Sequence, residues 1–346
     1  MPIRNTFLTW LFILYGSSIA AQKLPLLRVV ETGVKASFRA LSVVNNRVAW
    51  VAGSQGTVGR TTDGGQHWQF ETLVGFENHD FRTLYAFDSL TALVANAGSP
   101  GVILRTENGG KSWTEVYRNA HPDVFLDGTD FEDDHHGLVY GDPIGGRMLL
   151  LRTNDGGRSW MEIPEKNRPA LDSGEASFAA SGTNIRSLGQ QKYHIATGGK
   201  ISRLWTTEDN GNTWKPTPVP ILQGKASQGI FSIAEAGNIL MAAGGDYLAD
   251  TLKKDHIYYS ENGGKTWKFP QKPTGGYREC VAHIEKNMWI AVGPSGIDIS
   301  HDGGKNWRPI SAEKGFHTIR MARKGKRILL AGSKGKLGVL SWPDSE

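Results

Sequence analysis

Three acidic residues of this chain could perform acid–base chemistry: Asp127, Asp142 and Glu175. Glycoside hydrolases use a pair of carboxyl groups, about 5 Å apart when they retain and about 6.5–9.5 Å apart when they invert the configuration of the sugar. One group must hold a proton while the other stays ionised. If the chain is an enzyme, these three residues are its candidate catalytic groups, and the chemistry that they would support is glycoside hydrolysis.

Arginine, tyrosine and further acidic side chains accompany these carboxylates and would suit ligand binding without catalysis. An arginine fork matches a carboxylate, and a rim of aromatic and acidic groups suits a sugar. An alternative remains open, because buried charges need partners and these residues could simply pair with one another. The candidate ligand- or partner-binding residues are Arg39, Arg82, Asp127, Asp142, Asp246, Tyr247, Tyr277, Arg278 and His317.

A short motif of the form [ST]-x-[DN]-x-G-x-x-W occurs six times and shows how these residues are positioned. The first copy is TTDGGQHW. Its acid or amide can accept N–H groups of its own turn, its glycine permits a positive φ, and its tryptophan can bury a large apolar face. We therefore expect structural turns built on Asp63 and Trp68, Asn108 and Trp113, Asp155 and Trp160, Asp209 and Trp214, Asn262 and Trp267, and Asp302 and Trp307.

Each motif ends a unit with the pattern of a small antiparallel sheet. Apolar-alternating runs such as FRALSVV and VAWVAG precede the motif, and a fourth run such as WQFETLV follows its tryptophan. Four short strands in a repeat of about 40–50 residues are typical of a β-propeller blade. Three runs follow Trp307, and the run LPLLRVVETGV precedes the first unit. We predict an all-β, seven-bladed propeller whose last blade is completed by the N-terminal strand, with six blades as the alternative.

The first residues, MPIRNTFLTWLFILYGSSIAAQK, have a basic start, a short apolar stretch and small residues before a cleavage site. This pattern predicts a signal peptide over 1–21, followed by one propeller domain over 22–346. We therefore expect a secreted or periplasmic protein with no transmembrane segment in the mature chain. No cysteine follows the apolar stretch, so lipid attachment there is not expected. The single cysteine, Cys280, lies in an alternating run and is predicted to be buried.

The six motifs resemble the Asp box, or BNR repeat, of sialidases, sortilin-type receptors and photosystem II assembly factors. Beyond the motifs, the chain resembles the photosystem II stability and assembly-factor-like propellers, above all their exported bacterial members. The resemblance is carried by FLDGTDFEDDHHGLVYGDPIGGRMLLLRTNDGGRSW, GEASFAASGTN, GGDY, GGYREC and GPSG. It implies a propeller that assists assembly, and it implies no redox cofactor.

In a propeller, the loops between second and third strands converge with the connections between blades on one face, here called the upper face. The Asp boxes lie at the opposite end. The loops 141–147 and 244–256 and the insertion 164–183 depart from the repeat at the upper face. We therefore predict an exported, non-enzymatic binding or assembly module that holds a protein segment or a small anionic or carbohydrate ligand there. The alternative is an Asp-box glycoside hydrolase, although the sialidase signature [FY]RIP is absent and FRAL and FRTL stand in its place.

Charge and composition exclude several other classes. The net charge is +5, and the basic residues are scattered, so a nucleic-acid partner is not expected. The acidic run EDDHH, 132–136, matches a hairpin tip of the preceding unit and is predicted to be a solvated turn. No metal and no cofactor are expected, and the predicted state is a monomer.

Overall fold

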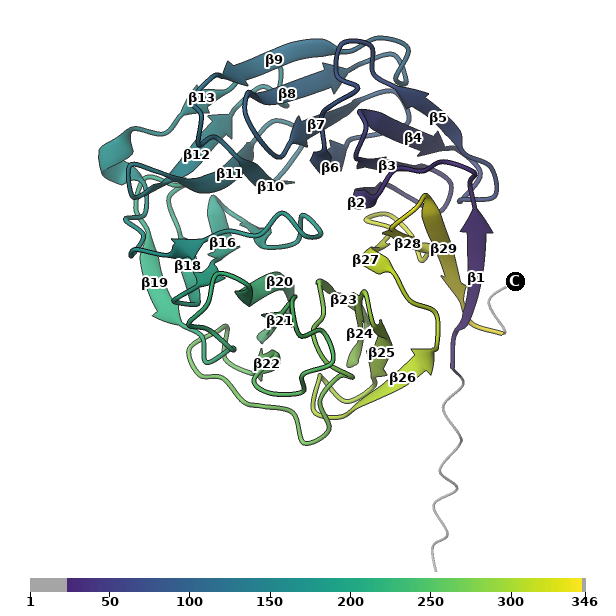
Figure 1. Cartoon of the computed structure of the whole chain (residues 1–346), viewed down its shortest axis with the longest axis vertical. Coiled ribbons are helices and arrows are strands. Elements are labelled where there is room, and N and C mark those ends of the chain that lie inside the picture. The colour runs from purple at the N-terminus through teal and green to yellow at the C-terminus, as the bar shows by residue number, and fades with distance from the viewer. Residues whose placement is uncertain (1–23, 344–346) are drawn as a thin grey trace, which may run out of the picture.

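The computed structural model describes residues 24–343. Seven antiparallel sheets surround a central channel in a closed ring (Figure 1). The prediction of an all-β, seven-bladed propeller is confirmed, and the six-bladed alternative is wrong. The predicted signal peptide, 1–21, lies outside the described residues. Within 24–343, no helix is both long enough and apolar enough to cross a membrane.

The first three blades each contain four strands that run in chain order from the channel outward. Blade 1 comprises β2 (Phe38–Val43), β3 (Ala49–Gly53), β4 (Thr57–Thr61) and β5 (Gln69–Thr72). Blade 2 comprises β6 (Phe81–Ala86), β7 (Ala92–Asn96), β8 (Gly101–Thr106) and β9 (Thr114–Asn119). Blade 3 comprises β10 (Leu126–Phe131), β11 (Gly137–Ile144), β12 (Arg147–Thr153) and β13 (Met161–Glu162).

Blades 4 and 5 depart from this regularity because of the insertion 164–183. Blade 4 comprises β15 (Ile185–Gly189), β16 (Lys192–Ala196), β18 (Arg203–Thr207) and β19 (Lys215–Pro218). Blade 5 comprises β20 (Gln228–Ala236), β21 (Ile239–Asp246) and β22 (Ile257–Ser260). The insertion forms a short 3₁₀ turn, η1 (Glu165–Asn167), and β14 (Glu175–Ala176), which joins the sheet of blade 5 through β17 (Gly198–Gly199). The expected fourth strand after Trp267 is reduced to one bridge between Tyr259 and Lys268.

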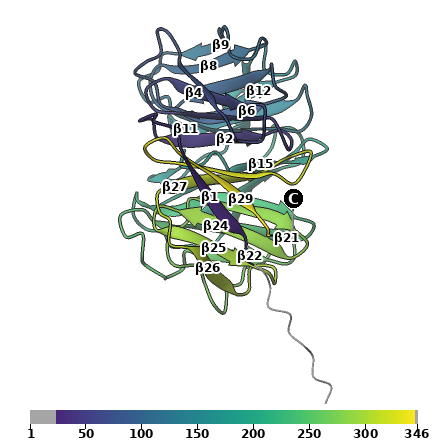
Figure 2. The same cartoon turned by 90° about the vertical axis from the view of Figure 1, so that its right-hand side faces the viewer.

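The last two blades close the ring. Blade 6 comprises β23 (Cys280–Glu285), β24 (Met288–Gly293), β25 (Gly296–Ser300) and β26 (Trp307–Ser311). Blade 7 comprises β27 (Phe316–Met321), β28 (Ile328–Gly332), β29 (Lys336–Ser341) and, as its outer strand, β1 (Leu26–Glu31). β1 pairs with β29 from Leu26↔Ser341 to Glu31↔Lys336 (Figure 2). This pairing removes the free edge that an open sheet would leave.

The Asp boxes form the same hydrogen bonds in every copy. In the first, Asp63 Oδ1 accepts the N–H of His67 at 3.0 Å, and the N–H of Gly65 donates to Thr61 Oγ1 at 3.0 Å. Gly64 and Gly65 both have a positive φ, which a residue with a side chain would adopt only under strain. The N–H of Gly64 also donates to Arg47 O in the turn between the first two strands at 2.8 Å. The boxes and these turns therefore share the lower face of the ring.

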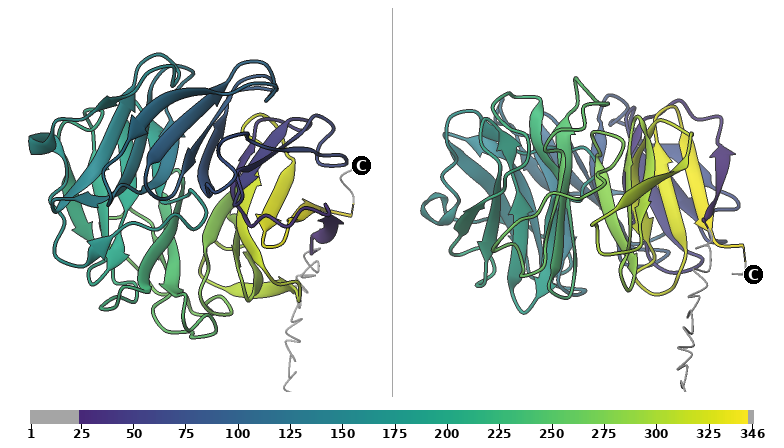
Figure 3. Two further views of the ribbon diagram at one scale, coloured as in Figure 1. Left: turned by 45° about the horizontal axis from the view of Figure 1, so that its top comes forward. Right: turned by 90° about the horizontal axis from the view of Figure 1, so that it is seen from below.

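The core is divided among the interfaces between neighbouring blades. Each Asp-box tryptophan packs against the preceding blade; Trp307, for example, joins a cluster with Met241 and Tyr259 of blade 5. Its indole N–H donates to Gly304 O at 2.9 Å, so its polar group is satisfied within the turn. Views from two further directions show the blades stacked side by side around the ring (Figure 3). The first strand of each blade is left to line the channel.

Candidate functional site

A β-bulge near the upper end of the first strand positions the channel residues. In blade 1 the pairing shifts between Phe38 and Ala40, so that Arg39 is the extra residue. The same shift occurs around Arg82, Asp127 and His317. A bulge re-aims one side chain without changing the rest of the strand. The upper end of the channel therefore carries a layer of charged side chains, one from each of these blades.

Arg278, a predicted binding residue, does not occupy the strand position of Arg39. Cys280 pairs with Val292 as Ala40 pairs with Ala52, so Glu279 occupies the bulge position of blade 6. Arg278 instead takes the buried place of Phe38 and is 2% exposed. It forms a salt bridge to Asp298 within its own blade at 2.5 Å. Its guanidinium is thus already paired.

Glu279 is the centre of the upper charged layer. Its carboxylate pairs with Arg39 at 3.3 Å and with His317 Nδ1 at 2.5 Å, and the hydroxyl of Tyr277 donates to it at 3.3 Å. Burial alone would raise the pKa of Glu279, but the His317 and Arg39 charges outweigh it and hold the pKa below its ordinary value. Three predicted ligand residues are therefore tied to Glu279, across blades 1, 6 and 7.

The insertion crosses the upper end of the channel as a segment that we call the plug, Ser177–Thr183. In Figure 1 its loop reaches from the teal blades into the centre of the ring. Ala180 O accepts a hydrogen bond from Arg39 at 3.2 Å, and Ser181 O accepts one from Arg320 at 2.8 Å. Phe178 stacks on Phe231 of blade 5 with ring centroids 3.9 Å apart. The plug thereby contacts several blades at once and closes the channel from above.

The three candidate catalytic carboxylates are buried to different degrees and have different partners. Glu175 is buried; its carboxylate accepts the hydroxyl of Thr197 at 2.6 Å and the indole N–H of Trp205 at 3.1 Å. Asp127 is 0% exposed, and neither of its carboxyl oxygens accepts a hydrogen bond from the described residues. Asp142 is half-buried and accepts the N–H of Ser177 at 3.0 Å. Their assignment to catalysis stays a prediction.

Among the other predicted upper-face residues, Arg82 and Tyr247 lie nearer to solvent and Asp246 is buried. Arg82 pairs with Asp80 at 2.7 Å and is about one third exposed. Asp246 accepts the amide of Gln228 at 3.0 Å and the N–H of Leu248 at 3.0 Å, whereas Tyr247 is 48% exposed. These residues are not gathered around one cavity with the others. Their role in binding a ligand stays a prediction.

A cavity of about 360 Å³ fills the lower half of the channel, and we call it the channel cavity. Its wall is made by the lower halves of the first strands of all seven blades, and Gly182 of the plug lies at its upper end. The turns that follow the first strands surround its other end. The channel cavity therefore has the plug at its upper end and faces the Asp-box side of the ring.

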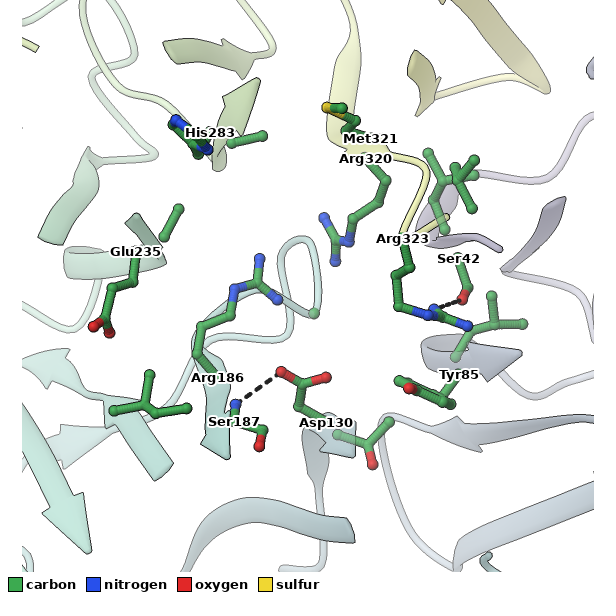
Figure 4. Close-up of a pocket in the computed structure, with 18 residues that line it drawn as sticks. Ser42, Tyr85, Asp130, Arg186, Ser187, Glu235, His283, Arg320, Met321 and Arg323 are labelled. Carbon is green, nitrogen blue, oxygen red and sulfur yellow. Dashed lines mark hydrogen bonds between the residues drawn. The ribbon is translucent and has the colours of Figure 1, made fainter. Parts of the chain in front are cut away.

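Three guanidinium groups, from Arg186, Arg320 and Arg323, point into the channel cavity (Figure 4). Within residues 24–343, none of them forms an ion pair with a carboxylate; Arg186 donates to Ile233 O at 3.1 Å, and Arg323 donates to Ser42 Oγ at 3.0 Å. Burial lowers the pKa of Arg320 to about 10, so it stays protonated at neutral pH. The cavity therefore carries cations that a ligand anion would stabilise.

Two acidic groups share the wall without forming an ion pair with these arginines in the described chain, although the charge of Asp130 favours the protonated form of Arg320. Asp130 accepts the N–H of Ser187 at 2.9 Å (Figure 4). Glu235 lies 3.6 Å from His194, and burial raises the pKa of Glu235 and lowers that of His194 to about 4. Both shifts favour the uncharged forms of this pair. The cavity keeps an excess of positive charge.

Sequence reasoning missed the channel cavity because it compared the blades only where their first strands begin. Ser42, Tyr85, Asp130 and Arg320 all lie three residues beyond the bulge residue of their blade. An alignment of blades at that position would have shown four different side chain types lining the channel. Cys280 is buried, as predicted, and Arg320 donates to its sulfur at 3.4 Å.

Comparisons with known proteins agree with the fold and the repeat. Residues 22–123 match the family described as photosynthesis system II assembly factor YCF48, and residues 258–269 match the BNR/Asp-box repeat. A curated relative, the photosystem II assembly lipoprotein Ycf48 of Synechococcus sp. (strain CC9902), is 22% identical over 304 residues, covering 85% of this chain and 81% of the relative. The chain is a β-propeller with BNR/Asp-box repeats that is similar to the photosystem II assembly factors.

Several solved structures have the same fold. YCF48 bound to D1 peptide is 18% identical with a TM-score of 0.68, covering 91% of this chain and 96% of that one. YCF48 from Cyanidioschyzon merolae is 17% identical with a TM-score of 0.67, covering 92% and 99%. The GH74 xyloglucanase from Xanthomonas campestris is 14% identical with a TM-score of 0.60, covering 91% of this chain and 53% of the enzyme. At these identities the likeness concerns the fold alone.

Proposed function

We propose that this protein is an exported, non-enzymatic assembly module that binds an acidic segment of a partner protein in the channel cavity. The observation that carries the proposal is the convergence of Arg186, Arg320 and Arg323 on one cavity, with no carboxylate paired to them in the described chain. A similar propeller has been solved with a peptide bound, which supports a protein segment as the ligand class. Export rests on the predicted signal peptide and on the lipoprotein name of the curated relative.

The upper face, where the sequence places the ligand, is the second candidate surface. Tyr247 and Arg82 keep exposed groups there. Arg39, Tyr277 and His317, however, contact Glu279, and Arg278 pairs with Asp298. An anionic ligand would have to compete with these internal contacts. In the channel cavity the arginines donate to neutral acceptors and form no ion pair within the described residues, so an anionic ligand would displace no carboxylate there and this cavity is the preferred site.

Glycoside hydrolysis receives less support. Glu175 is buried and bound by four neighbours, including Arg203 at 3.3 Å, and Asp127 is fully buried beside the plug. A general acid must reach the glycosidic oxygen directly or through one water molecule. Neither side chain has that access in this structure. Turnover of aryl glycosides that is lost in Asp142→Asn would restore the enzymatic alternative.

Fluorescence anisotropy with two labelled peptides tests the proposal. We expect a fluorescein-labelled hexaglutamate to bind and the matching hexaglutamine to bind at least about tenfold more weakly, because charge-assisted hydrogen bonds carry the affinity. Arg186→Gln and Arg323→Gln should each weaken hexaglutamate binding by about tenfold. Raising the salt concentration should also weaken it.

The matched control is Arg158→Gln. Arg158 lies on an Asp-box turn of the same lower face, pairs with Glu107 at 2.9 Å and is outside the channel cavity. This variant should bind hexaglutamate as the unchanged protein does. Equal binding of both peptides, or a loss as large in Arg158→Gln as in Arg323→Gln, would reject the channel cavity as the site.

A further inference from the structure

A second cavity, on the upper face between blades 2 and 3, has the opposite charge. This rim pocket has a volume of about 420 Å³. Its apolar lining includes Pro122, Val124, Phe125 and Pro143, and Asp142 contributes a carboxyl group. Asp123, whose side chain is exposed, also lines the pocket. A cavity that combines apolar walls with acidic groups suits a ligand with an aliphatic stem and a cationic end.

A second carboxyl group, that of Asp127, lies behind Asp142 and has no cationic partner in the described residues. Asp127 is fully buried, and burial together with the neighbouring Asp142 carboxylate raises its pKa well above the ordinary value. The backbone N–H groups of Asp142 and Ala179 lower the pKa of Asp127 and so offset part of this effect. Arg82 is the nearest cation to affect it, but that guanidinium pairs with Asp80. Neither Asp127 nor Asp142 has an ion-pair partner within residues 24–343.

Tyr140 is a second buried polar group beside the rim pocket that lacks a hydrogen-bond partner in the described residues. Its hydroxyl is fully buried, donates to no described residue and lies under the influence of both Asp127 and Asp142. One oxygen of Asp142 accepts the N–H of Ser177. The other oxygen of Asp142 forms no hydrogen bond within the described chain. That oxygen is the one available to a ligand entering the rim pocket.

We propose that the rim pocket binds an alkylammonium group, such as the end of a lysine side chain. The ammonium donates to the free oxygen of Asp142, and the methylene stem lies against Phe125 and the two prolines. An ammonium there would also favour the ionised form of Asp127, because no cation of the described chain contacts that carboxyl group directly. This site lies on the face opposite the channel cavity and does not rest on the function proposed for that cavity.

Protein NMR with three small probes tests the inference. Backbone amide shifts of ¹⁵N-labelled protein would be followed during titration with Nα-acetyl-lysine-N-methylamide, with cadaverine and with the uncharged Nα-acetyl-norleucine-N-methylamide. We expect shifts of the amides around Asp142 and Phe125, with lysine-amide affinity in the range of about 1 mM. The norleucine probe should bind at least about tenfold more weakly, because it lacks the charge-assisted hydrogen bond. Tighter binding of cadaverine than of the lysine probe would identify a free diamine as the ligand, and the reverse order a protein lysine.

Two variants and one control separate binding from folding. Asp142→Asn should weaken the lysine probe by at least about tenfold, whereas Glu77→Gln, an exposed acid of the connection between β5 and β6 outside the rim pocket, should change it by less than about twofold. Phe125→Ala should weaken the lysine probe but leave methylammonium unaffected, because only the stem contact is lost. Unchanged amide shifts in the folded protein with both amines, or equal binding of the norleucine probe, would overturn the inference.

Discussion

The two ends of the channel are lined by the same seven strands but use their charges in opposite ways. At the upper end, Arg39, His317 and Glu279 neutralise one another, and the plug covers them. At the lower end, Arg186 and Arg320 donate to backbone oxygens and meet no carboxylate within the described residues. A charge whose partner belongs to the fold supports stability, whereas a charge without one is available to a ligand.

The largest effect that this comparison predicts is at Glu279. Glu279→Ala should lower the free energy of unfolding by about 3–5 kcal/mol, because it leaves Arg39 and the buried His317 without their shared carboxylate. Urea denaturation followed by tryptophan fluorescence measures it. The lower-end counterpart, Arg323→Gln, should cost less than about 1 kcal/mol. Equal losses in both variants would break the distinction between the two ends.

A smaller effect is expected in the Asp boxes, which surround the lower face without entering the channel cavity. Asp302 accepts the N–H groups of Lys305 and Asn306 at 3.1 and 2.9 Å. Asp302→Ala should lower the free energy of unfolding by about 1 kcal/mol, as loss of a capping side chain does. Hexaglutamate binding should remain unchanged. A binding defect with normal stability would mean that the boxes take part in recognition.

The smallest expected effect is a change in how stability depends on pH, at Asp127. Its folded pKa is raised by burial and by Asp142, so above about pH 3.9 the unfolded chain releases this proton first. Stability from this group is complete below that pH and falls as pH rises towards the folded pKa. Asp127→Asn should therefore flatten that decline and be the more stable protein at neutral pH. Denaturation at several pH values measures it; parallel curves for Asp127→Asn and the unchanged protein would contradict it.

The fold could be predicted because its determinants are local and repeated. Six Asp boxes mark the third-to-fourth-strand turns, and the surplus run at each end of the chain indicates how the ring closes. What could not be predicted was register. Arg278 and Glu279 are consecutive in the sequence, yet Glu279 joins the charged layer of the channel whereas Arg278 forms its ion pair within its own sheet. Such a shift depends on packing against neighbouring blades, which sequence alternation does not record.

The candidate site could be predicted only in part, for a related reason. The upper-face residues were found because they depart from the repeat. The plug was visible as an insertion, but its contacts join residues far apart in sequence, such as Ser181 with Arg320. Arg186 and Arg320 lie inside strands whose alternation looks ordinary. Only closing the ring shows that they face one another across the channel.

The pairing of β1 with β29 also determines when, during synthesis of the chain, the ring can close. β1 is the first strand to be synthesised, and its only sheet partner is the last one made. The ring therefore cannot close until β29 has been made, and a chain that lacks it exposes unpaired strand edges at both ends. Closure of so long a loop is slow relative to folding of a single blade. A chain held unfolded until β29 has been made is spared this exposure.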